Sequence, residues 1–137
     1  IITGISLISI IGICLSAASF RYEPNNQMNR TSQISSFVLK QTHNQPFNFA
    51  YISSGNSDHA YRYFFKLSGR DPLTIENSQN DPKRTTVTDQ LLVICDTPCE
   101  PVGHALWEVA GFGEAKIVDH WKVSIVDVYK LSHASPK

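Results

Sequence analysis

The first twenty residues of the chain, Ile1 to Phe20, contain no charged side chain and no proline. Every lysine, arginine, aspartate and glutamate lies in the rest of the sequence. A helix rises by about 1.5 Å per residue, so twenty residues span roughly 30 Å, the thickness of the hydrocarbon layer of a bilayer. The missing charge therefore predicts a transmembrane helix over residues 1–20, with membrane lipid around it.

Two marks of a secretory signal peptide are also missing, because the chain has neither an initiator methionine nor a basic segment before the apolar run. We therefore expect a processed precursor or a piece of a longer membrane protein. Two alternatives stay open: the remnant of a signal peptide that ends at Ser16–Ala18, and a helix buried in a core. Lipidation at Cys14 is disfavoured, because the large Ile13 precedes it.

The absence of several other sequence features argues against particular classes of function. Twelve basic and twelve acidic residues cancel and form no run, which argues against nucleic-acid binding. The one Gly-x-Gly, residues 111–113, has no third glycine and ends a predicted helix, which is the wrong context for binding phosphates. No Gly-x-Ser-x-Gly sequence is present for serine hydrolysis. We expect no cofactor.

Enough residues remain after the apolar segment for one domain with a hydrophobic core. Residues 21–30 are polar and contain a proline, which predicts a juxtamembrane linker, and residues 31–137 form the soluble domain. Hydrophobic spacing, caps and breakers predict the elements of this domain. Helices are expected from residue 31 to before 46, 58–69 and 101–113, and strands at 47–52, 73–75, 88–95, 116–121 and 123–131.

The order of these elements predicts the fold class. Strands that alternate with helices favour an α/β domain, and the last two strands follow each other as a hairpin. The apolar run at 88–95 is typical of a central strand that is buried on both faces. We therefore expect an N-terminal transmembrane helix followed by a small α/β sandwich, with a mixed, mostly parallel sheet.

Cys95 and Cys99 are spaced by three residues in a turn that contains Pro98. Such a turn can bring the two sulfurs within bonding distance, and a disulfide persists on the oxidising side of a membrane. Free thiols and a zinc site are the alternatives. No second cysteine pair or His-x3-His spacing supports zinc, so we expect no metal.

Three residues are candidates for substrate binding. Asp58 and Asp96 are expected near the carboxyl ends of parallel strands, where α/β folds bind ligands, and Trp107 has a ring that can stack on a sugar. Helix capping and a solvated surface also explain the two carboxylates, and core packing or an interfacial anchor explains the tryptophan. No catalytic constellation is visible, which disfavours an independent small enzyme.

Four blocks of the soluble part resemble one kind of membrane protein. They are NFAYISSGNSDHAYRYFF, TDQLLVICDTPCEP, GHALWEVAGFGEAKI and VDVYKL, which together cover most of residues 48–131. In order and spacing they are similar to the C-terminal extracytoplasmic domain of bacterial multi-pass glycosyltransferases of the dolichyl-phosphate-mannose protein mannosyltransferase type. These blocks are patterns of a structural domain, and none is a catalytic motif.

The resemblance implies a membrane enzyme that takes a sugar from a polyprenyl-phosphate donor and passes it to a protein or glycan acceptor outside the cell membrane. The family's catalytic acids lie near the start of its proteins, among membrane helices that this sequence does not contain, so no catalytic residue is carried over. Residues 1–20 would be the last membrane helix, and 31–137 a lid or acceptor-side module. An extracytoplasmic location suits a bridge between Cys95 and Cys99. The alternative is a single-pass anchored binding or assembly module that recognises a peptide or glycan.

Overall fold

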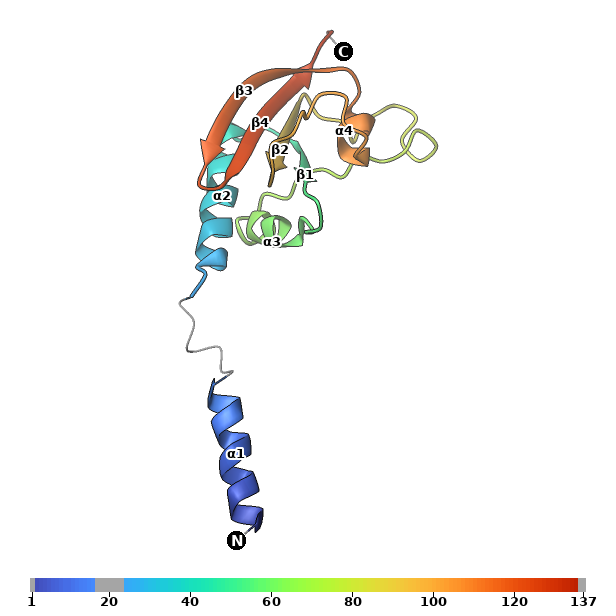
Figure 1. Cartoon of the computed structure of the whole chain (residues 1–137). Coiled ribbons are helices and arrows are strands. Elements are labelled where there is room, and N and C mark those ends of the chain that lie inside the picture. The colour runs from blue at the N-terminus through green and yellow to red at the C-terminus, as the bar shows by residue number, and fades with distance from the viewer. Residues whose placement is uncertain (1, 17–23, 136–137) are drawn as a thin grey trace.

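The computed structural model describes residues 2–16 and 24–135 (Figure 1). Helix α1 runs from Ile2 to Ser16, and its described side chains are exposed. Residue 1 and residues 17–20 of the predicted membrane helix, like residues 21–23 of the predicted linker, lie outside the described part. Within the described residues, no helix combines the length and the apolar character needed to cross a membrane.

A four-stranded mixed sheet with the order β1-β2-β4-β3 forms the centre of the α/β domain. The strands are β1 (Asn48–Ile52), β2 (Gln90–Cys95), β3 (Ala115–Val123) and β4 (Val126–His133). Strands β1 and β2 are parallel, whereas β4 is antiparallel to both β2 and β3.

The expectation of a mostly parallel sheet is therefore wrong. Strand β2 is buried along its whole length, as its apolar sequence predicted, but only one of its two neighbours is parallel. Burial of both faces results from cover on each side of the sheet and does not fix strand direction. The C-terminal hairpin pairs through β4, so the sheet has one parallel pair and two antiparallel pairs.

Helices α2 (Gln27–Gln41) and α3 (His59–Leu67) cover one face of the sheet. The helical spacing of Ile34 and Val38 places both side chains in this core, against residues of β1, β2 and β4. Phe49 and Phe65 meet edge to face with ring centroids 4.9 Å apart, a preferred geometry for aromatic pairs.

Helix α4 (Trp107–Phe112) and the segment 73–88 cover the other face. Helix α4 and this segment pack closely against each other, since a Cβ added at Gly111 would lie 2.9 Å from Cγ2 of Ile75. Asn48 fastens the same segment to β1, because its Nδ2 donates to the carbonyl oxygens of Leu73 at 2.8 Å and Thr86 at 2.9 Å. Residues 73–75, which were predicted as a strand, contribute a single bridge from Leu73 to Asn48.

Several element boundaries differ from those expected. Helix α2 begins at Gln27, before the predicted start at Thr31, after Asn26 in a left-handed conformation with φ of 50°. Helix α4 begins at Trp107, because residues 101–106 form turns after Pro101. The hairpin turns at Ser124, whose φ is 57°, and Val118 forms a bulge in β3 between two register positions.

Candidate functional site

A cavity of about 570 Å³ lies at the carboxyl ends of the two parallel strands. It is bounded by the start of α2, the end of β1, the loop into α3, the residue after β2 and the turn between β3 and β4. Its polar lining consists of Asn25, Gln27, Arg30, Thr31, Tyr51, Asn56, Ser57, Tyr61 and Asp96. This is the edge of the sheet at which α/β folds usually bind ligands.

Asp96 is the predicted residue that reaches this cavity. Its backbone N–H donates to the carbonyl oxygen of Ile52 at 3.0 Å, which extends the pairing of β1 and β2 by one residue. The Asn56 side chain donates to Oδ2 of Asp96 at 3.0 Å, and the Ser53 hydroxyl donates to the same oxygen at 3.5 Å. Ser53 also accepts the N–H of Asn56 at 3.0 Å, so the β1–α3 loop and Asp96 position each other.

Two tyrosines form the aromatic wall of the cavity. The rings of Tyr51 and Tyr61 lie edge to face, with centroids 5.1 Å apart. Burial raises the pKa of Tyr61 to about 12, and the neighbouring Tyr51 and Asp96 act in the same direction. Burial also raises the pKa of Tyr51, with the negative charge of Asp96 as a further cause. Both hydroxyls are therefore protonated at neutral pH, and the Tyr51 hydroxyl hydrogen-bonds to the Asp96 carboxylate.

Arg30 brings a cation to the same cavity from the first turns of α2. Its Nη2 donates to the carbonyl oxygen of Asn25 at 3.4 Å, and no carboxylate of the described residues forms an ion pair with it. The cavity thus combines a guanidinium, a carboxylate, amides and hydroxyls. None of the described lining residues is a histidine or a cysteine. The arrangement suits recognition of a polar ligand and provides no nucleophile paired with a histidine base.

Asp58 does not line the cavity. Its carboxylate forms an ion pair with Arg62, one helical turn along α3, and the Arg62 guanidinium lies 5.8 Å from the centre of the Phe49 ring. Its backbone carbonyl accepts the first helical N–H groups, from Tyr61 at 3.0 Å and Arg62 at 3.1 Å. These contacts give Asp58 a role at the start of α3, and the structure does not bring it to Asp96.

Trp107 lies on the other side of the sheet. Its indole Nε1 donates to the carbonyl oxygen of Ile75 at 2.9 Å, and its ring is in contact distance of the Cβ position of Gly111. The residue is 50 % exposed, and it belongs to α4, which packs against the face opposite α2 and α3. The three predicted residues are therefore not gathered into one site.

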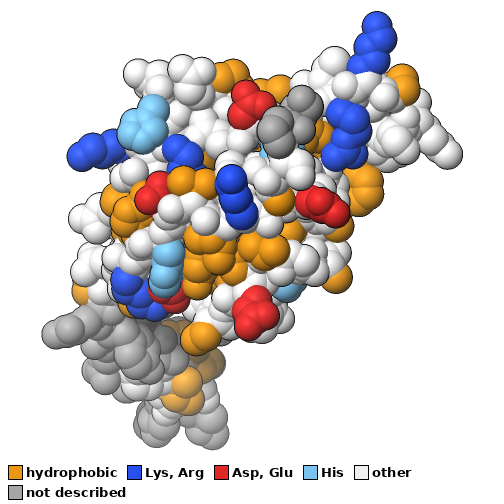
Figure 2. Space-filling model, turned by 90° about the horizontal axis from the view of Figure 1, so that it is seen from above, with side chains coloured by type: hydrophobic (Ala, Val, Ile, Leu, Met, Phe, Trp, Pro, Cys, Tyr) orange, Lys and Arg blue, Asp and Glu red, His pale blue; other side chains and the backbone are white. Residues whose placement is uncertain are grey.

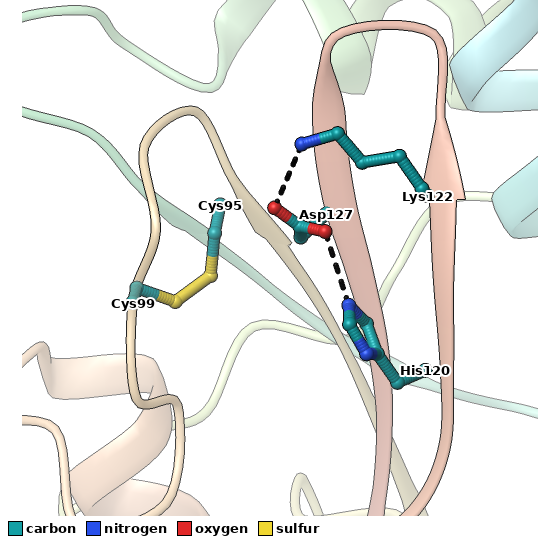
Figure 3. A network of polar contacts seen from close by, with 5 residues as sticks. All are labelled: Cys95, Cys99, His120, Lys122 and Asp127. Carbon is teal, nitrogen blue, oxygen red and sulfur yellow. Dashed lines mark hydrogen bonds and ion pairs between the residues drawn. A yellow bond between two sulfur atoms is a disulfide. The ribbon is translucent and has the colours of Figure 1, made fainter.

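The structure joins Cys95 and Cys99 by a disulfide, with their Cα atoms 6.1 Å apart. The bridge closes the turn that contains Asp96, which lines the cavity. Figure 3 shows it near Asp127, which faces Cys95 across the β2–β4 ladder. Lys122 and His120 each contact the Asp127 carboxylate at 3.0 Å, and the Lys122 hydrogen bond is the main reason that the pKa of Asp127 is lowered.

Sequence reasoning missed most of the cavity. Arg30 fell in the predicted linker, Tyr51 in the predicted strand 47–52 and Tyr61 in the predicted helix 58–69, and none of the three was a candidate site residue. In the strand segment FNFAYI, Tyr51 follows Phe49 by two residues and so shares its face of the sheet, which is the signal that could have placed Tyr51 beside α3. Among the described residues, no group of three or more potential ligands is placed to hold a metal ion.

The surface carries charges of both signs. Figure 2, which looks down on the molecule from above, shows basic, acidic and histidine side chains interspersed around hydrophobic ones, without a field of a single sign. Comparison with protein-family models, with curated proteins and with solved structures found no match.

Proposed function

We propose that the chain is the C-terminal part of a mannosyltransferase-like membrane glycosyltransferase that uses a polyprenyl-phosphate sugar. Residues 1–20 anchor it in the membrane as the last membrane helix. The α/β domain lies on the extracytoplasmic side and does no chemistry itself. Its cavity holds the protein or glycan acceptor near the site of transfer.

The position of the cavity relative to α1 carries this proposal. Asn25 lines the cavity and follows Ser16, the last residue of α1, by nine residues. A chain of that length spans at most about 32 Å even when fully extended. If α1 lies in lipid, the cavity is therefore held close to the membrane surface, where a lipid-linked sugar is exposed.

The chemistry of the lining supports acceptor binding over catalysis. Glycans and peptides present hydroxyl, amide and carbonyl groups, which the Asp96 carboxylate, the Asn56 amide and the two tyrosine hydroxyls can bind. Tyrosine rings also supply apolar surface for a sugar or a side chain. The only lining carboxylate is Asp96 among the described residues, whereas glycosyl chemistry commonly employs a pair.

Binding of defined acceptors to the full chain tests the proposal. The purified chain in detergent micelles is titrated with a mannose oligosaccharide and, separately, with a serine- and threonine-rich peptide. We expect one of the two to bind, and Asp96→Asn to weaken that binding about tenfold, since hydrogen bonds to a charged group contribute about 1.5–3 kcal/mol.

Asp119→Asn is the matched control, because Asp119 is exposed on β3 and does not line the cavity. It removes the same charge and should leave the affinity unchanged. Failure of both probes to bind, or equal affinity of the Asp96 variant and the native chain, would contradict acceptor binding. The single-pass module uses the same cavity, and several apolar segments upstream in the reading frame would favour the transferase over it.

A further inference from the structure

We propose that the end of the domain that carries the cavity docks onto the bilayer surface, with Met28 and Ile125 inserted among the lipid headgroups. This inference rests on the proposed function only in taking residues 1–20 as the membrane anchor. It adds a second contact between the chain and the lipid, through the folded domain.

Met28 and Ile125 are large apolar side chains on two neighbouring turns. Met28 is in the first turn of α2 and is 72 % exposed, and Ile125 is in the β3–β4 turn and is 54 % exposed. The two turns meet at the cavity, which is lined by Gln27 and Arg30 from one and by Ile125 from the other. Figure 1 also shows the hairpin turn beside α2.

The polar groups on the same two turns match the headgroup layer. A smaller hollow of about 330 Å³ is lined by Asn26, Asn29, Arg30, Gln33 and Ser124. None of these residues is acidic, and Arg30 has no carboxylate partner among the described residues. A guanidinium binds phosphate oxygens in a fork, and amides and hydroxyls bind phosphate and ester oxygens. Met28 and Ile125 are next to Asn29 and Ser124 of this hollow in the chain, and apolar side chains beside basic and polar groups are typical of an interfacial contact.

A bilayer is favoured over a second protein copy because of the tether. Only eight residues lie between Ser16 and Asn25, so the apolar tips stay within reach of any lipid that surrounds α1. A tethered contact is intramolecular in effect, so two inserted side chains and one guanidinium suffice where a free domain would not stay bound. Docking in this orientation also opens the cavity beside the headgroups.

Depth-dependent quenching in vesicles tests the docking. The full chain, in which Cys14 is replaced by serine and Ile125 by cysteine, is labelled without reductant by an environment-sensitive fluorophore. It is then reconstituted in phosphatidylcholine vesicles that contain a nitroxide on the lipid headgroup. We expect a blue shift of the label at position 125 and loss of its fluorescence to the nitroxide.

Val102→Cys is the matched control. Val102 is 43 % exposed, and it lines a hollow together with Ala115 and Ala134, at the opposite end of the hairpin from Ile125. A label there should keep its aqueous emission and should not be quenched. Equal, aqueous behaviour of the two labels would overturn the proposed docking.

A label on the native Cys14 separates this inference from the anchoring on which it rests. Quenching of that label by a nitroxide deep in the acyl chains, with no quenching at position 125, refutes docking and leaves the anchor intact. If the Cys14 label is not quenched at any depth, the anchor and the docking are both refuted.

A charge substitution tests the two side chains themselves. A label at Ser57→Cys, on the cavity rim, reports the distance of this end from the headgroups. The double substitution Met28→Asp and Ile125→Asp should abolish quenching of that label, whereas Val102→Asp should preserve it. Quenching that survives the double substitution would overturn the role of Met28 and Ile125. Met28, Ile125 and Val102 are all exposed, so we expect these substitutions to leave the fold intact.

Discussion

Asn48 Oδ1 accepts both the backbone N–H of Thr88 at 2.7 Å and its hydroxyl at 2.9 Å. The two residues are forty positions apart, and Asn48 is fully buried. The other end of the same amide binds Leu73 and Thr86, so one side chain joins β1 to both ends of the segment that covers the sheet. A buried amide that is fully satisfied in this way is a strong constraint on the surrounding structure.

Replacement of Asn48 by alanine should destabilise the domain by about 2–4 kcal/mol, since it leaves the buried N–H of Thr88 and the partly buried carbonyls of Leu73 and Thr86 without this partner. Urea unfolding of the full chain measures the effect. Asn29→Ala, at an exposed position of α2, should change the unfolding free energy by less than about 0.5 kcal/mol. Similar unfolding curves for the two variants would show that water replaces the Asn48 contacts.

Gly111→Ala should destabilise the domain by about 1–3 kcal/mol, because the added methyl group meets Cγ2 of Ile75 and overpacks the contact of α4 with the segment 73–88. Gly55→Ala is the control, because nothing lies within 4 Å of a Cβ built there and its φ is not left-handed. Thermal unfolding followed by circular dichroism compares the two. A Gly111 variant as stable as the Gly55 variant would mean that Ile75 moves freely.

Asp81 gives the domain a specific sensitivity to acid. The backbone N–H of Thr86, at 2.7 Å, and that of Thr85, at 2.9 Å, donate to its carboxylate and lower its pKa well below the ordinary value of 3.8. A lowered folded-state pKa contributes stability above the unfolded pKa, and this contribution is lost as the pH falls below it. The urea midpoint should therefore begin to drop as the pH falls to the ordinary pKa of 3.8, and it should continue to drop toward the lowered pKa of folded Asp81.

The test of this acid sensitivity is Asp81→Asn, which should be less stable than the native chain at pH 7 and should lose less stability on acidification. Asp119→Asn, at an exposed position, should follow the native pH profile. Parallel profiles for the native chain and the Asp81 variant would contradict the assignment.

The number of free thiols before and after reduction tests the disulfide. Alkylation of the denatured chain without reductant should modify one thiol, that of Cys14, and after reduction it should modify three. Loss of the bridge by Cys99→Ser should cost about 2 kcal/mol by the loop-closure relation for a ring of about five residues. Three thiols labelled before reduction would exclude the bridge between Cys95 and Cys99.

The sequence predicted the main elements because their local patterns agree with their surroundings. The apolar run of β2 is buried on both faces, and the helical spacing of Ile34 and Val38 matches the buried side of α2. Strand direction was not predictable, since an apolar run at 90–95 packs equally well beside a parallel or an antiparallel neighbour. The predicted strand at 73–75 is a single bridge at Leu73. The side chain of Asn48 also holds Leu73 in place, and such a long-range contact cannot be predicted from the local sequence.

The candidate site was only partly predictable. Asp96 follows a buried strand, and the rule that ligands bind at strand ends locates it. The same rule also predicted Asp58, but in the structure Asp58 forms an ion pair with Arg62 of the same helix and does not line the cavity. Arg30 and Ile125 reach the cavity through the packing of α2 and the hairpin, and no local pattern records that contact.

The bulge at Val118 has a consequence for how molecules of this domain meet in solution. Strand β3, nine residues long, is an edge strand of the sheet and pairs with β4 alone among the described strands. Lys116, Asp119 and Lys122 are exposed around this bulge, and bulges and charged side chains are the features by which natural sheets disfavour pairing at an edge strand.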